Sequence, residues 1–256
     1  MTPSRKKKKT HRIGTENESS LHRTLKFRYA DPGKTEEDRA GFVCDAVGPD
    51  GEAVEIQTGN FSALKNKIPA LAARGRIRLV YPVIVTKTIE LYDIGGNLIS
   101  RRKSPRKGSM WDIFGELIYA PSLMNLRRLT VEIAFVDATE RRRDDGQGSW
   151  RRKGVSIEDR SLDLFRESLI LRKKADWRRF LPVKGEFTAR DLAEKTHIRP
   201  ALARKTLYVL EKAGIVEKIR KAGRSWLFRT AAVNGKNVPA QAGNPAPADS
   251  PGKEAG

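Results

Sequence analysis

The segment from residue 187 to 229 has the most regular pattern in this sequence, and it leaves few folds open. Thr188 precedes a short amphipathic segment, and Asp191 follows it by three residues, in the manner of a helix capping box. After a tight turn, Pro200 opens a second segment with apolar residues at helical spacing, and Gly214 ends it. Two alternating segments surround a basic turn. The pattern predicts two helices and a two-stranded hairpin, at residues 189–195, 201–213, 215–219 and 225–229.

This order of elements resembles the winged helix-turn-helix family over about 50 residues. The resemblance is carried by the segments DLAEKTHI and LYVLEKAGIVEK and by the basic turn, which contains a glycine. In that family the second helix enters the major groove of DNA, and the wing lies along the backbone or the minor groove. The resemblance therefore implies DNA contacts from the second helix and the wing, made by Arg199, Arg204, Lys205, Lys221 and Arg224.

Charge favours the same partner. Residues 180–230 hold 12 basic residues against 5 acidic, and the whole chain holds 51 Lys and Arg against 31 Asp and Glu, a formal net charge of +20. Such a charge attracts polyanions, acidic membrane surfaces included. No apolar run approaches the roughly 18 residues that span a bilayer. We therefore expect DNA as the partner, with RNA as an alternative and no membrane, and a homodimer stays open. Some winged helices mediate protein contacts instead.

The composition indicates a reducing compartment. The single cysteine, Cys44, excludes an internal disulfide and a zinc site built from cysteines. We expect the cytoplasm, in association with the nucleoid. Residues 1–14 form a basic arm without a core-forming pattern, and residues 231–256 are rich in Ala, Pro and Gly, so both ends are expected to be disordered.

Before the helix-turn-helix segment, helical and strand patterns are mixed. Asn60 is expected to cap one helix and Gly75 to end it. The expected helices are 18–29, 60–73 and 110–119, and the expected strands are 40–47, 53–58, 77–85, 88–92, 98–102 and 129–136. This order predicts one α/β (α+β) domain over residues 15–155, followed by the helix-turn-helix domain over residues 156–230.

Acidic residues in the first two expected strands form a candidate active site. Asp45 stands late in one strand, and Glu55 and Gln57 share one face of the next, because strand side chains alternate. A hairpin turn can bring the two carboxylates side by side. Such a pair can hold a hard cation such as Mg²⁺, which activates water and stabilises charge on a phosphate. Glu18 could add a third carboxylate.

These residues resemble the PD-(D/E)xK nuclease superfamily, over roughly residues 16–90. The matching segments are NESSLH, GFVCD and VEIQTG, followed by a helix and the buried strand RIRLVYPVIV. The resemblance implies a restriction-endonuclease-like fold in which Asp45 and Glu55 bind Mg²⁺ or Mn²⁺, assisted by the carbonyl of Ile56. Gln57 stands at the position that orients the attacking water, and Glu18 completes the catalytic set.

Three departures from that family weaken the implied activity. Gln57 occupies the usual lysine position and carries no positive charge, although Lys65 or Lys67 on the next helix could supply one. Cys44 replaces the proline before Asp45, and one strand fewer precedes Asp45 than the family's core contains. The plain alternative is that these carboxylates lie on the solvent face of a hairpin.

The leading hypothesis is a metal-dependent endonuclease-like enzyme that a winged helix delivers to DNA. The alternative is a non-catalytic winged-helix DNA-binding regulator. A further hypothesis concerns two basic triplets near tryptophans, residues 101–103 near Trp111 and residues 151–153 beside Trp150. They could form one phosphate-binding surface on which a base stacks, unless Trp111 belongs to the core.

Overall fold

The computed structural model describes residues 18–39 and 41–232. The basic arm expected at residues 1–14 and nearly all of the tail expected at residues 231–256 lie outside these described residues. Within the described ranges, no helix combines the length and apolar character needed to cross a bilayer.

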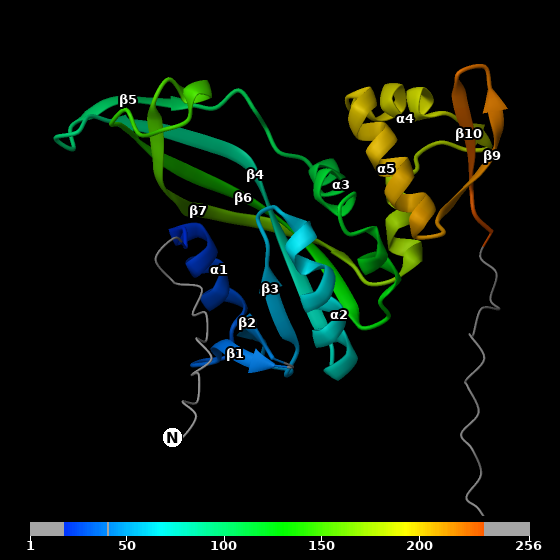
Figure 1. Ribbon diagram of the computed structural model, residues 1–256, viewed down its shortest axis with the longest axis horizontal. Helices are drawn as coiled ribbons and strands as arrows, with labels where there is room; N and C mark the ends of the chain where they lie inside the picture. Colours follow the sequence, from blue (N-terminus) through cyan, green and yellow to red (C-terminus); the bar gives the residue numbers. More distant parts are fainter. Residues whose placement is uncertain (1–17, 40, 233–256) are drawn as a thin grey trace, which may run out of the picture.

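In the described part of the chain, seven strands form one mixed sheet (Figure 1). The central strands β3, β4 and β6 are parallel, and the remaining neighbours pair antiparallel. The order is β1-β2-β3-β4-β6-β7, and β5 pairs with the far end of β4. The strands are β1 Thr35–Arg39, β2 Phe42–Val47, β3 Ala53–Ile56, β4 Ile77–Tyr92, β5 Leu98–Lys103, β6 Leu129–Asp144 and β7 Val155–Leu171.

Helices cover both faces of this sheet. On one face, α1 (Ser20–Tyr29) buries Leu21 and Leu25 against β2, β3, β4 and β6 residues. It begins where Ser19 accepts a hydrogen bond from the His22 amide. On the other face lie α2 (Leu64–Arg74) and α3 (Ile113–Leu117), which bury a larger apolar core. Short 3-10 turns η2 to η6 adjoin these elements, at Phe61–Ala63, Met110–Asp112, Pro121–Asn125, Trp150–Arg152 and Lys174–Phe180.

The fold differs from the expected one at β1, at β7 and at the start of α2, and the strands expected at 77–85 and 88–92 are one strand, β4. β1 is an additional strand before Asp45; its sequence TEEDR has no apolar alternation because it is an exposed edge strand. β7 pairs with β6 along its length, so the sheet continues to Leu171, past the boundary expected at residue 155. Asn60 does not cap α2 through its side chain: it takes a left-handed backbone conformation, and the turn η2 precedes the helix.

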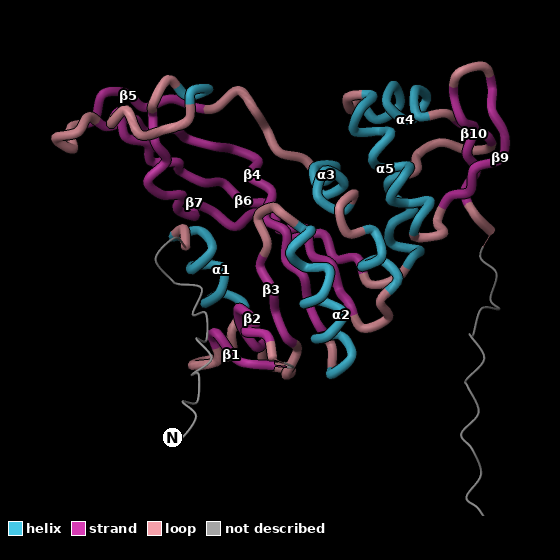
Figure 2. Tube along the Cα trace, in the orientation of Figure 1, coloured by secondary structure: helices cyan, strands magenta, loops and turns pink. Residues whose placement is uncertain are grey.

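A smaller unit follows the large sheet (Figure 2). The capping box at Thr188 and Asp191 forms as expected, with the Thr188 amide donating to Asp191 Oδ2 at 2.7 Å. His197, in the left-handed conformation, makes the tight turn, and Pro200 starts the second helix. A three-stranded sheet of order β8-β10-β9 completes the unit. Its elements are β8 Glu186–Phe187, α4 Ala189–Thr196, α5 Pro200–Lys212, β9 Val216–Ala222 and β10 Ser225–Thr230.

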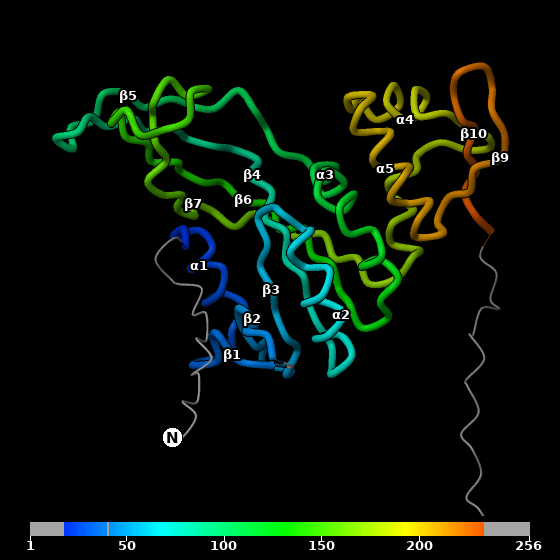
Figure 3. The backbone as a smooth tube through the Cα atoms, viewed as in Figure 1, coloured from blue at the N-terminus to red at the C-terminus, as the bar shows by residue number. Residues whose placement is uncertain are grey.

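An aromatic cluster joins the two units, and we call it the aromatic joint. It consists of Trp111, Phe114, Trp177 and Phe180, whose neighbouring rings lie 4.8–6.3 Å apart between centroids. Here α3 packs against α5, and the chain enters the smaller unit from β7 (Figure 3). Because Trp111 is buried in this joint, the idea that it and Trp150 form one exposed surface is wrong.

Candidate active site and nucleic-acid interface

The β2–β3 pair opens at Asp45. Ala46 pairs with Val54 and Val47 with Ala53, but the ladder stops there. Beyond it, Asp45 Oδ2 accepts a hydrogen bond of 2.8 Å from the backbone amide of Ile56. The carboxylate thus binds an amide of the neighbouring strand where the ladder no longer continues. This opening brings Asp45 to the peptide group that follows Glu55.

Three residues of the α1 segment approach Asp45 from one side. The ring Nε2 of His22 lies 2.8 Å from the carbonyl oxygen of Ile56 and 3.3 Å from Asp45 Oδ2. Its Nδ1 contacts Glu18, whose carboxylate also pairs with Lys26 at 2.8 Å. Burial opposes a charge on His22, but Asp45 and Glu18 outweigh it and raise the pKa of His22 to about 9. A cationic ring therefore lies between two oxygens of the opening.

A lysine from α2 approaches Glu55. Lys67 Nζ lies 2.6 Å from Glu55 Oε1, while Oε2 is buried and has no hydrogen-bond partner among the described residues. The side chain of Glu55 is buried. Burial, followed by the negative charge of Asp45, raises the pKa of Glu55 to about 7 despite Lys67. The pKa of Asp45 is lowered instead, because its hydrogen bond and charge interaction with His22 outweigh its burial.

The expected site residues are therefore placed unequally. The Asp45 carboxylate accepts from the Ile56 amide and contacts α1, whereas the Glu55 carboxylate contacts α2 through Lys67. Glu18 reaches Asp45 only through His22 and Lys26. Gln57 turns away from both, since its amide donates to the Gly59 carbonyl and its backbone amide to Val80.

Sequence reasoning missed His22 and Lys26. A signal was available, because Glu18, His22 and Lys26 are spaced at four-residue intervals, which places them on one face of a helix. Of the two lysines considered on the following helix, Lys67 contacts Glu55, whereas Lys65 is exposed.

Three oxygen donors line this opening, and the cationic side chains of His22 and Lys67 lie against them. The donors are the carboxylates of Asp45 and Glu55 and the carbonyl of Ile56, and the chemistry of this set suits a hard cation. Across residues 18–39 and 41–232, no group of three or more His, Cys, Asp or Glu side chains is arranged to hold a metal ion.

The second expected site lies on α5 and the β9–β10 hairpin. Along α5, an outward stripe carries Arg204, Tyr208 and Lys212 at spacings of four residues, with the half-buried Lys205 next to Arg204, while the opposite face is buried. Lys221 and Arg224 stand at the hairpin turn. Within the described residues, none of the five expected DNA contacts pairs with a carboxylate, in contrast to Arg190, Arg220 and Arg229.

Comparisons with known proteins identify relatives of this chain. Residues 19–172 match the family model described as "Domain of unknown function (DUF8091)". This range runs from the N-cap of α1 to the end of β7. A protein from Treponema pallidum (strain Nichols), described as an uncharacterized protein, is 31% identical over 223 residues, which cover 85% of this chain and 87% of the relative. No solved structure matches the chain.

Proposed function

The chain belongs to the family described as Domain of unknown function (DUF8091), and we propose that it is a metal-dependent, endonuclease-like enzyme that acts on DNA phosphodiesters. In this proposal the large sheet is a restriction-endonuclease-like domain, and the smaller unit is a winged helix-turn-helix that delivers it to DNA. The observation that carries the proposal is the opening at Asp45, where the Asp45 carboxylate accepts from the Ile56 amide and its negative charge helps to raise the pKa of Glu55.

The residues at the opening fit a divalent cation. Mg²⁺ is commonly held by one or two carboxylates together with waters, so Asp45, Glu55 and the Ile56 carbonyl are a sufficient set. Glu55 Oε2 is buried without a partner, and the charge of Asp45 helps to raise the pKa of Glu55. A bound cation gives Glu55 Oε2 a partner, and its positive charge offsets the repulsion between the two carboxylates. When bound, Mg²⁺ or Mn²⁺ supplies an activated water and stabilises negative charge on the phosphate.

Lys67 provides the positive charge that the glutamine at position 57 lacks. Its ammonium donates to Glu55 Oε1 from α2, the helix that follows the strand. In the proposed mechanism, Asp45 and Glu55 hold the cation and Lys67 stabilises the charge that develops on the phosphate. Glu18 and Lys26 hold His22 in place. Gln57 remains the position at which a lysine can be introduced as a test.

The DNA-binding part of the proposal rests on charge and exposure. The outward stripe of α5 and the hairpin turn present cations without carboxylate partners in the described chain. An α-helix fits the major groove of DNA, and a basic hairpin beside that helix can contact the DNA backbone. We propose that the protein acts in the cytoplasm, on the DNA of the nucleoid. The cleavage assay that tests this proposal also includes RNA.

Neutral variants of the two carboxylates test the enzymatic proposal. We expect Asp45→Asn and Glu55→Gln to abolish cleavage that depends on Mg²⁺ or Mn²⁺, because each removes a charged ligand, while DNA affinity stays or rises. The assay covers linear, branched and single-stranded DNA, and RNA. Asp50→Asn is the matched control, since Asp50 lies in the turn of the same hairpin and pairs with Arg76. Cleavage that survives both variants contradicts the proposed site.

A non-catalytic DNA-binding regulator is the second candidate. The cationic ring of His22 favours it, because the ring already lies between Asp45 and the Ile56 carbonyl, where a metal ion would bind. The two carboxylates also contact different helices, Asp45 through His22 of α1 and Glu55 through Lys67 of α2. Gln57→Lys distinguishes the candidates, because it restores the usual residue of the resembled family. If neither wild type nor this variant cuts any substrate with either metal, the regulator is the better assignment.

A further inference from the structure

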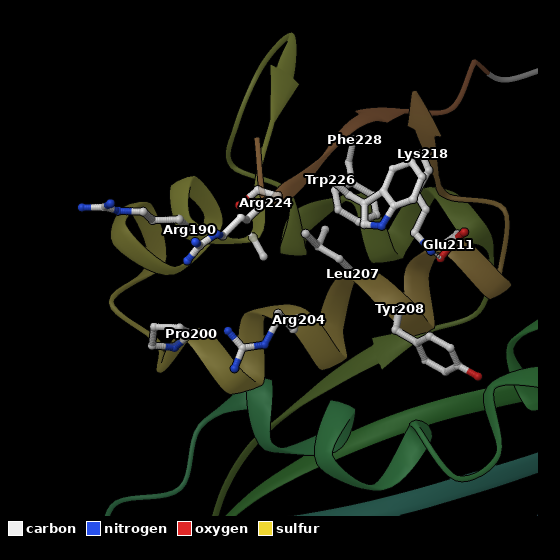
Figure 4. Close-up of a pocket in the computed structure, with 12 residues that line it drawn as sticks. Arg190, Pro200, Arg204, Leu207, Tyr208, Glu211, Lys218, Arg224, Trp226 and Phe228 are labelled. Atoms are coloured by element: carbon white, nitrogen blue, oxygen red, sulfur yellow. Dashed lines mark ion pairs between the residues drawn. The ribbon is translucent and has the colours of Figure 1, made fainter. Parts of the chain in front are cut away.

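A groove separates α5 from the β9–β10 hairpin (Figure 4). It encloses about 380 Å³, which is ample for one nucleobase and lies within the usual range of small-ligand sites. Its floor includes Leu207 of α5 and Phe228 of β10. The groove therefore combines an apolar base with an open side that faces solvent between the helix and the hairpin.

Two half-exposed aromatic side chains line the groove. Trp226 is 42% exposed and Tyr208 is 39% exposed, although aromatic surface of this size is usually buried. The ammonium groups of Lys218 and Lys221 each lie 5.5 Å from the centre of the Trp226 ring. Both ammonium groups lie over the indole ring, in cation–π contact with it, so a base that stacks on Trp226 would take the place of at least one of these flexible side chains. The result is a flat aromatic surface beside cations.

Charge at the rim selects an anionic occupant. Arg204 and Arg224 border the groove, and within residues 18–39 and 41–232 neither forms an ion pair with a carboxylate. Glu211 is the one acidic side chain among the lining residues, and it pairs with Lys218 at 3.0 Å. Apolar walls with free cations at the rim match the two parts of a nucleotide, its base and its phosphate.

We infer that this groove holds an unpaired nucleobase stacked on Trp226, so that the chain prefers DNA in which a duplex adjoins a single strand. A base within an intact duplex shows only its edges in the grooves, and its flat faces are covered by neighbouring pairs. An aromatic face in a cleft can act only on a base that has left the stack. This inference rests on the proposed DNA binding and names the class of DNA.

The test uses the full chain and two probes, a blunt duplex and the same duplex with a short 3′ or 5′ tail. A fluorescent 2-aminopurine base in the tail reports stacking directly. We expect the wild type to bind a tailed duplex roughly ten-fold tighter than the blunt one and to change the 2-aminopurine signal, because stacking of one base contributes that much. Trp226→Ala reduces the preference to within about two-fold and removes the signal.

Matched variants guard against loss of folding. Trp226→Phe keeps an aromatic face, so it retains most of the preference. Trp150→Ala removes a tryptophan that is 83% exposed in the distant turn η5, so it leaves the preference unchanged. If Trp226→Ala weakens binding of the blunt and the tailed duplex equally, the inference about an unpaired base is overturned, while the proposal that the chain binds DNA still stands. Absence of binding to any DNA overturns the proposed function as well.

Discussion

At the scale of single residues, the opening at Asp45 shows how a charge can be supplied from a neighbouring element. Gln57 lies directly after the end of β3; its side-chain amide donates to the Gly59 carbonyl, and it carries no charge. Lys67 reaches Glu55 from α2 instead. Because α2 packs directly behind β3 and β4, a side chain one turn into that helix can replace one on the strand. In the proposed mechanism, the charge of Lys67 therefore takes the place of the lysine that the resembled motif carries on the strand.

We expect Lys67→Met to lower cleavage about 10²- to 10³-fold, since that is the usual effect of removing one charge-stabilising group. Lys65→Met is the control, because Lys65 lies on the same helix but is exposed. Single-turnover cleavage rates measure the effect, and a thermal melt verifies folding. Equal rates for the two variants contradict the role assigned to Lys67.

Glu140 links stability to pH. Its buried carboxylate accepts from Arg142 and Arg160 at 2.8 Å and from Lys87 at 3.2 Å. Burial opposes the charge, but these three cations lower the pKa of Glu140 to about 2 from an ordinary 4.5. A pKa lower in the folded chain means that the charged form stabilises the fold above pH 4.5. That stability is lost as the pH falls from about 4.5 towards 2.

Urea unfolding of wild type and Glu140→Gln between pH 6 and pH 3 measures this contribution. We expect a loss of at most about 2 kcal/mol in wild type over this range, reduced by the partial exposure of Arg160, and a smaller pH slope in the variant. Glu167→Gln serves as the control, because Glu167 is exposed on β7. An unchanged slope in Glu140→Gln excludes Glu140 as its source.

At the scale of elements, local signals predicted more than long-range ones. The capping box at Thr188, the proline at Pro200 and the glycine at Gly214 placed α4 and α5 within one residue, because these signals act within a single turn. β7 escaped prediction for a physical reason. Its pairing with β6 shifts register in three places, so apolar side chains do not alternate steadily along it.

The candidate site was predicted in part. Asp45 and Glu55 were found from their spacing across a hairpin turn, which is a local property of the chain. His22 and Lys26 belong to α1, which packs on the face of the sheet opposite to α2. Only this packing brings the two side chains to Asp45. Such contacts depend on tertiary structure, so strand alternation could not indicate them.

The β9–β10 hairpin, which is the proposed wing, offers a matched pair of residues for testing phosphate contacts. Lys221 has no carboxylate partner in the described chain, whereas its neighbour Arg220 pairs with Glu186 at 3.1 Å. We expect Lys221→Ala to weaken binding of all DNA sequences similarly and to reduce the slope of log affinity against log salt by about 1. Arg220→Ala has a smaller effect. Affinity titrations at several salt concentrations measure the slopes, and equal slopes for both variants contradict the proposed contact.

At the scale of the whole molecule, the two units share one apolar core. The largest cluster of buried residues runs from Phe61 and Leu79 of the large-sheet unit to Leu207 and Phe228 of the smaller one. Phe180 lies between them, with its ring 4.8 Å from Phe114 and 5.1 Å from Trp111. In the proposed function, this joint holds the smaller unit at a fixed orientation to the opening at Asp45, so that DNA bound at α5 is positioned relative to that opening.

A shared core predicts that the two units unfold together. We expect Phe180→Ala to cost about 3–5 kcal/mol, the usual range for a buried phenylalanine. Because Phe180 serves both units, the most protected amides of β6 and of α5 should lose the same free energy of opening. Hydrogen exchange measures both at once, and Phe27→Ala, at an exposed phenylalanine of α1, is the control. If protection falls in α5 and persists in β6, the units fold independently, and the aromatic joint does not fix how the smaller unit is oriented on the sheet.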